Sequence, residues 1–271
     1  MASLDVLLRK TLVAEKICQV DRTEGKYIDS PYGSQPTTVV QAIVGTYATA
    51  AYTLTDELLT VNEEFIVAEH VYDFEQVLTK FDVMANRIDE QNYSIAAAID
   101  GYVINRLCED ANGTYTTPVG GFTTAANIIT IIANLQSKVA GYESAYKNTF
   151  LVIENTDLPG FIISAAATGF QQADSTLKNG FSGTCLGTDI FVVRTGTYVD
   201  TTYAGASATV TNVGHRVFGV KNVATYAAPR MIQYEEKSVA AKTGKECVTW
   251  GYIGFKLWVT KYNLVVDVTI A

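Results

Sequence analysis

The residues that could perform chemistry in this chain are few and lie far apart. His70 and His215 are the only two histidines, whereas zinc and iron sites need several clustered imidazole or thiolate ligands. The four cysteines are scattered along the chain: Cys18, Cys108, Cys185 and Cys247. We therefore predict that each histidine is a surface or strand residue and that the cysteines are reduced structural thiols. No metal ion and no cofactor is expected.

Motifs for nucleophilic and nucleotide chemistry are also missing. The tetrapeptide Gly180-Phe181-Ser182-Gly183 is close to a nucleophile elbow, but G-x-S-x-G needs a second glycine that is absent here. Neither a phosphate-binding G-x-x-x-x-G-K-[ST] loop nor a G-x-G-x-x-G fingerprint occurs. The sequence predicts no catalytic centre. An unrecognised enzymatic site within residues 118–230 stays open as an alternative.

Charge and hydropathy argue against two further classes of protein, those that bind nucleic acid tightly and those that span a membrane. Lys and Arg number 20 against 28 for Asp and Glu, a net charge of −8, and basic residues never cluster into the positive stripe that gripping phosphates requires. No run of eighteen apolar residues exists, and the first sixteen residues lack the pattern of a secretory signal. With 48% hydrophobic residues, the chain is expected to fold around a sizeable core and to stay in a cytosol.

The segment that must position the rest of the chain runs from residue 81 to residue 111. Its apolar residues recur at helical spacing, which predicts an amphipathic helix about 40 Å long. The predicted stripe consists of Ile88, Ile95, Ile99, Val103 and Leu107. We expect this stripe to lie on a sheet formed by the C-terminal strands. Asn105 is expected on the opposite, polar side of the helix.

The segments before this helix look unable to stabilise themselves. Residues 3–19 are predicted to form an amphipathic helix, and residues 20–36, broken by proline and glycine, an extended arm. Together, residues 1–36 are expected to add little to the core, so that their deletion would leave a folded subunit. Residues 37–72 alternate like a β-hairpin, with a turn at Thr55-Asp56-Glu57. An isolated two-stranded hairpin is marginal in water, so the hairpin and the arm should pack on neighbouring copies. Contacts are predicted at Leu59, Val61, Phe65, Val67, Leu4 and Leu8.

The remainder alternates between helices and strands. We predict a helix over 127–139, a buried strand over 149–154, a short helix from residue 155 and a strand within 188–196. Residues 195–214 read as a surface excursion and residues 216–228 as one strand. Two strong strands follow at 253–259 and 264–270, after a turn at Thr243-Gly244-Lys245.

The order of these elements resembles that of the major capsid proteins of tailed phages, which have the Hong Kong 97 phage fold. Four segments carry the likeness, which is closest to the branch with short chains and no cleaved prodomain: LTVNEEFIVAEHVYDFEQVL before the helix, AAAIDGYVINRL within it, GHRVFGVKNVATYAAP, and the C-terminal GYIGFKLWVTKYNLVVDVTIA. No cysteine or lysine marks itself as a covalent cross-linking site.

The resemblance implies an α+β fold with an N-terminal arm (1–36), an extended hairpin loop (37–72), a peripheral domain with the spine helix (73–117 and 231–271) and an axial domain (118–230). It implies a structural protein without enzymatic activity that self-assembles, as hexamers and pentamers, into the icosahedral shell around a phage genome. The implied partners are other copies, scaffolding, portal and decoration proteins, and packaged DNA held without specific binding, with no membrane. The implied location is the virion, after assembly in the host cytoplasm.

Two other assemblies stay open. An encapsulin-type nanocompartment has the same fold, but is cellular and loads enzymes rather than DNA. A phage tail-tube protein is also rich in β-strands and forms assemblies, but it would lack the long central helix.

Overall fold

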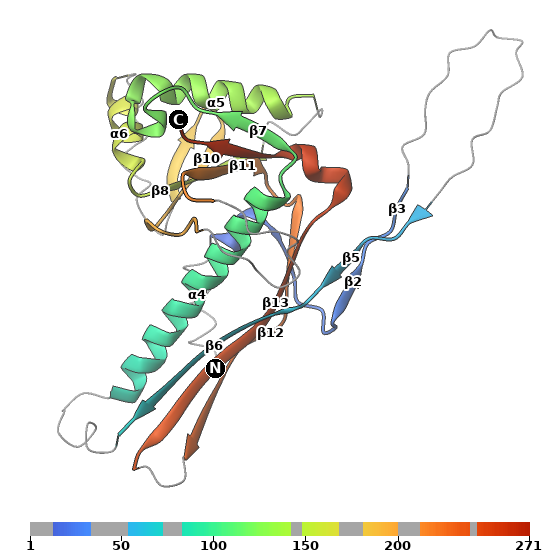
Figure 1. The fold of residues 1–271 in the computed structure, drawn as a ribbon, viewed down its shortest axis with the longest axis vertical. Helices are drawn as coiled ribbons and strands as arrows, with labels where there is room; N and C mark the ends of the chain where they lie inside the picture. Colours follow the sequence, from blue (N-terminus) through green and yellow to red (C-terminus); the bar gives the residue numbers. More distant parts are fainter. Residues whose placement is uncertain are drawn as a thin grey trace, which may run out of the picture.

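The long helix is the element on which both large sheets of this protein pack. The computed structural model describes residues 13–33, 54–72, 83–141, 148–167, 181–199, 212–238 and 243–271. Helix α4 (Val83–Asp110) runs alongside a long, narrow sheet and ends at a compact body that contains a second sheet (Figure 1). This mixture of helices and sheets confirms the predicted α+β class.

The compact body is built on a six-stranded sheet. In spatial order its strands are β7 (Gly113–Thr116), β14 (Val265–Thr269), β11 (His215–Val220), β8 (Thr149–Glu154), β10 (Thr188–Val193) and β9 (Phe181–Cys185). Helices α5 (Ala125–Val139) and α6 (Leu158–Ala167) lie beside it with the short η1 (Gly121–Thr123). Strand β8 is buried along its whole length, because Leu151 and Ile153 face the α5 cluster while Phe150 and Val152 face the α4 cluster.

The narrow sheet has four strands in the order β1 (Gln19–Asp21), β12 (Ala224–Ser238), β13 (Lys245–Leu257) and β6 (Glu63–Val71). Strands β12 and β13 form the long hairpin predicted around Gly244, whose φ of 111° suits glycine. Helix α4 packs on one face of this sheet. There the Tyr102 ring meets the rings of Phe65 and Phe255 edge-on, at centroid distances of 5.8 and 6.5 Å.

The predicted stripe of α4 is confirmed. Ile95, Ile99, Val103 and Leu107 are at most 1% exposed, and they share one cluster with residues of β13 and β14. Ile88 packs on a smaller cluster around Val71 and Cys247. The stripe therefore lies on the C-terminal strands, as the periodicity of the sequence indicates.

The prediction for Asn105 is wrong. This residue is fully buried, and its side-chain amide donates to the carbonyl oxygens of Gly101 at 2.6 Å and Thr197 at 2.9 Å. Its side-chain oxygen accepts the N–H of Val199 at 3.1 Å. The Asn105 side chain holds the chain after β10 against the helix. Its hydrogen bonds offset the free-energy cost of burying a polar amide.

The extended hairpin is made of different segments from those predicted. Strand β2 (Tyr27–Asp29) pairs with β5 (Leu58–Thr60), and β3 (Tyr32–Gly33) pairs with β4 (Leu54–Thr55). The predicted turn at residues 55–57 is wrong, because these residues continue one arm of the hairpin. Glu57 is buried there, and its carboxylate accepts the N–H of Val259 at the start of η4 (Val259–Leu264).

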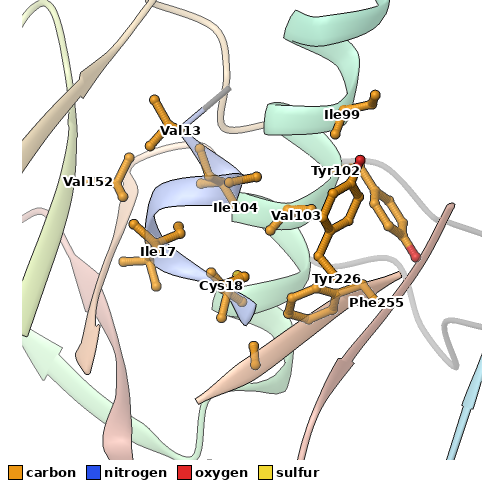
Figure 2. Close-up of a cluster of buried hydrophobic side chains, with 14 of the residues drawn as sticks. Val13, Ile17, Cys18, Ile99, Tyr102, Val103, Ile104, Val152, Tyr226 and Phe255 are labelled. Atoms are coloured by element: carbon orange, nitrogen blue, oxygen red, sulfur yellow. The ribbon is translucent and has the colours of Figure 1, made fainter. Parts of the chain in front are cut away.

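The N-terminal segment from residue 13 to residue 21 belongs to the subunit core. Helix α2 (Ala14–Ile17) is short, but Val13, Ala14, Ile17 and Cys18 are all at most 4% exposed. Figure 2 shows Val13, Ile17 and Cys18 among side chains of α4 and both sheets. The prediction that the arm adds little to the core is therefore wrong for residues 13–21, while residues 1–12 lie outside the described residues.

The two sheets exchange strands at places that differ from the predicted domain boundaries. The segment predicted as one strand, 216–228, is two strands, because the chain turns at Asn222, whose φ is 61°. Strand β11 lies in the six-stranded sheet and β12 in the four-stranded sheet. Strand β14 returns to the six-stranded sheet, between β7 and β11. Residues 265–269, which were predicted in the peripheral domain, thus belong to the six-stranded sheet of the compact body.

Candidate assembly surfaces

The chemistry-bearing side chains serve the fold. Both histidines lie in strands, as predicted: His70 in β6 and His215 in β11. His215 Nδ1 lies 2.8 and 2.9 Å from the two carboxylate oxygens of Asp267 on the neighbouring β14. This pair ties the edge of one strand to the next. In the described part of the chain, no three side chains gather in a way that could hold a metal ion.

A buried group of charged side chains around Arg216 is also structural. Arg216 donates from Nε to Asp157 at 2.6 Å and from a terminal nitrogen to Glu154 at 3.0 Å, and all three residues are less than 10% exposed. The second Glu154 oxygen accepts the N–H of Gly196 at 2.9 Å. Because each charge has a partner, this network can be buried, and it fixes the start of α6 and the chain after β10 to β11.

Of the four described side chains that were predicted as assembly contacts, three face their own subunit. Leu59 is fully buried in a cluster with Ala227 and Trp258, so it offers no surface to a neighbour. Phe65 and Val67 pack against the α4 cluster. The prediction needs correction for these three side chains, because the hairpin base and α4 already cover them. Leu4 and Leu8 lie outside the described residues.

The opposite face of the same sheet is partly uncovered. Outward-pointing apolar side chains form what we term the outer-face patch: Ile66, Val248, Trp250 and Tyr252. Ile66 is 59% exposed and Tyr252 40% exposed, while Val248 and Trp250 are partly exposed. Ile66 lies directly opposite Trp250 in the β6–β13 ladder, which brings the side chains of that pair together. Gln233, Glu235 and Glu64 occupy the adjoining outward positions, so an aromatic centre has a polar rim.

The hairpin base explains where the patch ends. Strand β5 crosses the outer face at Gly254, where a Cβ atom would lie 2.7 Å from the carbonyl oxygen of Thr60 and 3.0 Å from Leu59. Only glycine permits this approach. Beyond Gly254 the outer face opens, and Tyr252 and Ile66 are exposed there.

A second apolar surface lies on the hairpin itself. Ile28 and Leu59 are paired across β2 and β5 and face the core, so Tyr27 and Leu58 point the other way. Tyr27 is 55% exposed, Leu58 47% and Leu54 56%. We term these three residues the hairpin patch. The hairpin projects away from the body, opposite to the distal end of the four-stranded sheet (Figure 1).

An open pocket joins the hairpin base to the outer face. It is lined by Glu24, Gly25, Lys26, Val61, Pro229 and Tyr252. Among the described residues that were predicted as assembly contacts, Val61 is the one that lines this pocket. Its partly apolar lining and open mouth suit the side chain of another protein segment better than a tightly held small molecule.

The outer-face patch was not predicted from the sequence, because Phe65 and Val67, rather than Ile66, were expected on the face of β6 that contacts a neighbouring copy. Phe65 and Val67 are the larger apolar set, and a sheet covered by one amphipathic helix turns its more apolar face toward that helix. Ile66 is then an isolated apolar residue between Glu64 and Ala68 on the outward face. That exception was visible in the sequence, whereas its pairing with Trp250 was not.

We compared the chain with known proteins and solved structures. No family model matches the chain, and no curated protein matches its sequence. Solved structures do match. The capsid structure of the cyanophage P-SCSP1u is similar with a TM-score of 0.73 at 11% identity, over 96% of this chain and 88% of that chain. The mature capsid of bacteriophage PhiM1 gives 0.70 at 11% identity, over 96% and 87%.

This chain has the Hong Kong 97-type capsid fold. A virus-like particle from Pyrococcus furiosus is also similar, with a TM-score of 0.62 at 10% identity, over 98% of this chain and 96% of that chain. The capsid fold therefore spans nearly the whole of this chain. Within the described residues, no helix combines the length and the apolarity needed to cross a membrane.

Proposed function

We propose that this protein is the major capsid protein of a tailed bacteriophage, a structural subunit that assembles with many copies of itself into a closed shell. The observation that carries the proposal is the similarity to assembled phage capsids, which covers 96% of this chain and 88% of the cyanophage subunit. The proposed site of action is the virion, with assembly in the host cytoplasm.

The surface of the subunit supports self-assembly. Monomeric proteins rarely expose large contiguous apolar patches, and such patches mark interaction sites. Here the outer-face patch and the hairpin patch lie on different parts of one chain. Two different surfaces that meet between copies make a heterologous interface, which closes into rings when the rotation permits. We propose that hexamers and pentamers form through such contacts, and that Val61 takes part through its pocket.

The proposed domains follow the two sheets. The peripheral domain would consist of α4 with the four-stranded sheet, and the axial domain of the six-stranded sheet with α5 and α6. The described part of the extended hairpin would comprise residues 27–33 and 54–60. Scaffolding, portal and decoration proteins are proposed as further partners. The packaged DNA would contact the shell without specific binding, which agrees with a net charge of −8.

An encapsulin-type nanocompartment is the second candidate, because the Pyrococcus furiosus virus-like particle has the same fold. The TM-scores do not separate the two candidates, because the phage structures range from 0.73 to 0.62 and the Pyrococcus furiosus particle gives 0.62. The contents of the particle distinguish the two. Particles purified from the cells that naturally produce the protein should contain double-stranded DNA if they are phage shells, and enzyme cargo if they are nanocompartments.

Electron microscopy of the purified full-length protein tests assembly itself. We expect closed particles of one or a few fixed diameters in negative stain. Open tubes would favour a tail-tube protein instead. Small soluble particles at every concentration, with or without scaffolding protein, would contradict the proposal.

A further inference from the structure

A buried carboxylate in the middle of α4 holds the N-terminal segment in place. Asp100 accepts the backbone N–H of Ala14 through Oδ1 at 2.8 Å and that of Val13 through Oδ2 at 3.0 Å. These donors belong to the first turn of α2, whose amides have no partner within the helix. Both bonds join residues at least 86 positions apart, so the contact fastens the segment 13–21 to the rest of the subunit.

The rest of the segment is held by burial. Val13, Ile17 and Cys18 insert between α4 and the two sheets (Figure 2), and β1 adds three residues in parallel to β12. The segment is short and lies at one end of the described chain. Because β1 is an edge strand, the segment can leave while all other strands stay paired. Water would then fill its cavity and hydrate Asp100.

The groups that face Asp100 are few. Lys16 and Glu15 act on it from α2 with opposite signs, and Cys18 and Tyr226 lie close enough to sense its charge. Burial raises the pKa values of the Cys18 thiol and the Tyr226 hydroxyl well above their usual ranges. For Asp100, burial outweighs the two N–H bonds and raises the pKa of the carboxyl group to about 7.

We propose that Asp100 makes docking of the segment 13–21 dependent on pH, so that the docked segment is favoured in mildly acidic solution and its release is favoured above neutrality. In the released state Asp100 is hydrated and regains an ordinary pKa near 3.9. The docked state therefore binds the proton more tightly than the released state. Docking is strongest at acidic pH and weakens as the pH rises toward and through 7.

The size of the effect follows from the two protonation equilibria. With a docked pKa of about 7 and a released pKa near 3.9, the docking constant falls by roughly tenfold between pH 6 and pH 8. Above pH 8 little further change is expected. Protonation of Asp100 thus sets the fraction of full-length subunits in which residues 13–21 are released from the core. This holds whether or not the subunit is part of a shell.

Cys18 provides a built-in reporter, because it is 3% exposed when the segment is docked, and Cys108 in α4 provides the control at 5%. The experiment measures alkylation of each thiol by iodoacetamide in the full-length protein, using peptide mass spectrometry. Each rate is divided by the rate for the same thiol in denatured protein, which removes the intrinsic pH dependence of thiolate reactivity. We expect the Cys18-to-Cys108 ratio to rise roughly tenfold from pH 6 to pH 8. A flat ratio overturns the proposal.

Two variants assign the effect to Asp100. Asp100→Asn cannot ionise, so its ratio should not change with pH. If that variant does not fold, Lys16→Met still tests the proposal. Removing the nearby cation strengthens proton binding by Asp100, so the rise in the ratio should shift to higher pH. A pH-dependent ratio in Asp100→Asn, or an unshifted midpoint in Lys16→Met, would assign the effect to another group.

Discussion

The two faces of strand β6 have different partners although their residues alternate along one segment. Phe65 and Val67 face α4 and belong to the subunit core, whereas Ile66, between them, is 59% exposed on the outer face. In a free subunit the inner face of β6 is largely covered by α4, whereas its outer face is exposed at Ile66. We infer from this difference that one face of the sheet stabilises the folded subunit and the opposite face contacts other copies. Substitutions on the inner face should lower the stability of the subunit, and substitutions on the outer face should affect assembly.

Deleting the N-terminal segment should have the largest effect on folding. A chain lacking residues 1–21 loses the buried side chains of Val13, Ile17 and Cys18 and leaves Asp100 without its two donors. Burying one aliphatic side chain contributes about 1.5–3 kcal/mol, and a domain is commonly stable by only 5–15 kcal/mol. We expect little soluble, folded protein by circular dichroism. A deletion of residues 1–12 is the comparison that isolates residues 13–21, and equal stability of the two would show that the segment is dispensable.

Phe65→Asp should be the most damaging point substitution on the inner face. It removes the edge-on contact with Tyr102 and buries a charge in the α4 cluster, at a cost of several kcal/mol. This reverses the expectation from sequence, which placed Phe65 at an interface between copies. We expect the free energy of unfolding in urea to fall before assembly is tested. An unchanged unfolding midpoint would place Phe65 outside the core.

Ile99→Ala tests the stripe of α4 with a smaller change. Ile99 is 1% exposed at the middle of the helix, and removing such a side chain typically costs about 2–5 kcal/mol. For a chain of this size the melting temperature should fall by roughly 4–20 °C. Tyr93→Ala, at an exposed position of the same helix, is the control and should change it little. Asn105 is unsuitable as a control because its buried amide holds residues 197–199.

Ile66→Asp should change stability least and assembly most. Its side chain is exposed in the subunit, so we expect the free energy of unfolding to change by at most about 0.5 kcal/mol. A charge beside Trp250 would nevertheless oppose an apolar contact between copies. Sedimentation velocity should show fewer assembled particles than for the wild type, with folded subunits in their place. Normal particle yield from this variant would mean that the outer-face patch is not an interface.

The sequence predicted those features that depend on neighbours in the chain. The periodicity of residues 83–110, the turn at Gly244 and the alternation before residue 270 are local patterns, and all three elements formed as expected. The class of fold followed from their order.

The features that were missed depend on distant partners. Asn105 looks like a surface residue until Thr197 accepts its amide, and the polar residues after Ile17 look like an arm until β1 pairs with β12. The hairpin was misplaced because its two arms, residues 27–33 and 54–60, are separated in sequence by the twenty residues 34–53. For the candidate surface, alternation in β6 revealed two faces but not which face α4 would cover.

The most direct test of these separate roles is a cryo-electron microscopy reconstruction of particles assembled by the full-length protein. In a closed shell, Ile66 and Trp250 should lie within about 4 Å of apolar atoms of a neighbouring copy, while Phe65 stays against Tyr102 of its own chain. A closed shell in which Ile66 and Trp250 face solvent, or in which Phe65 contacts the neighbour instead, would contradict the assignment of folding to one face and assembly to the other.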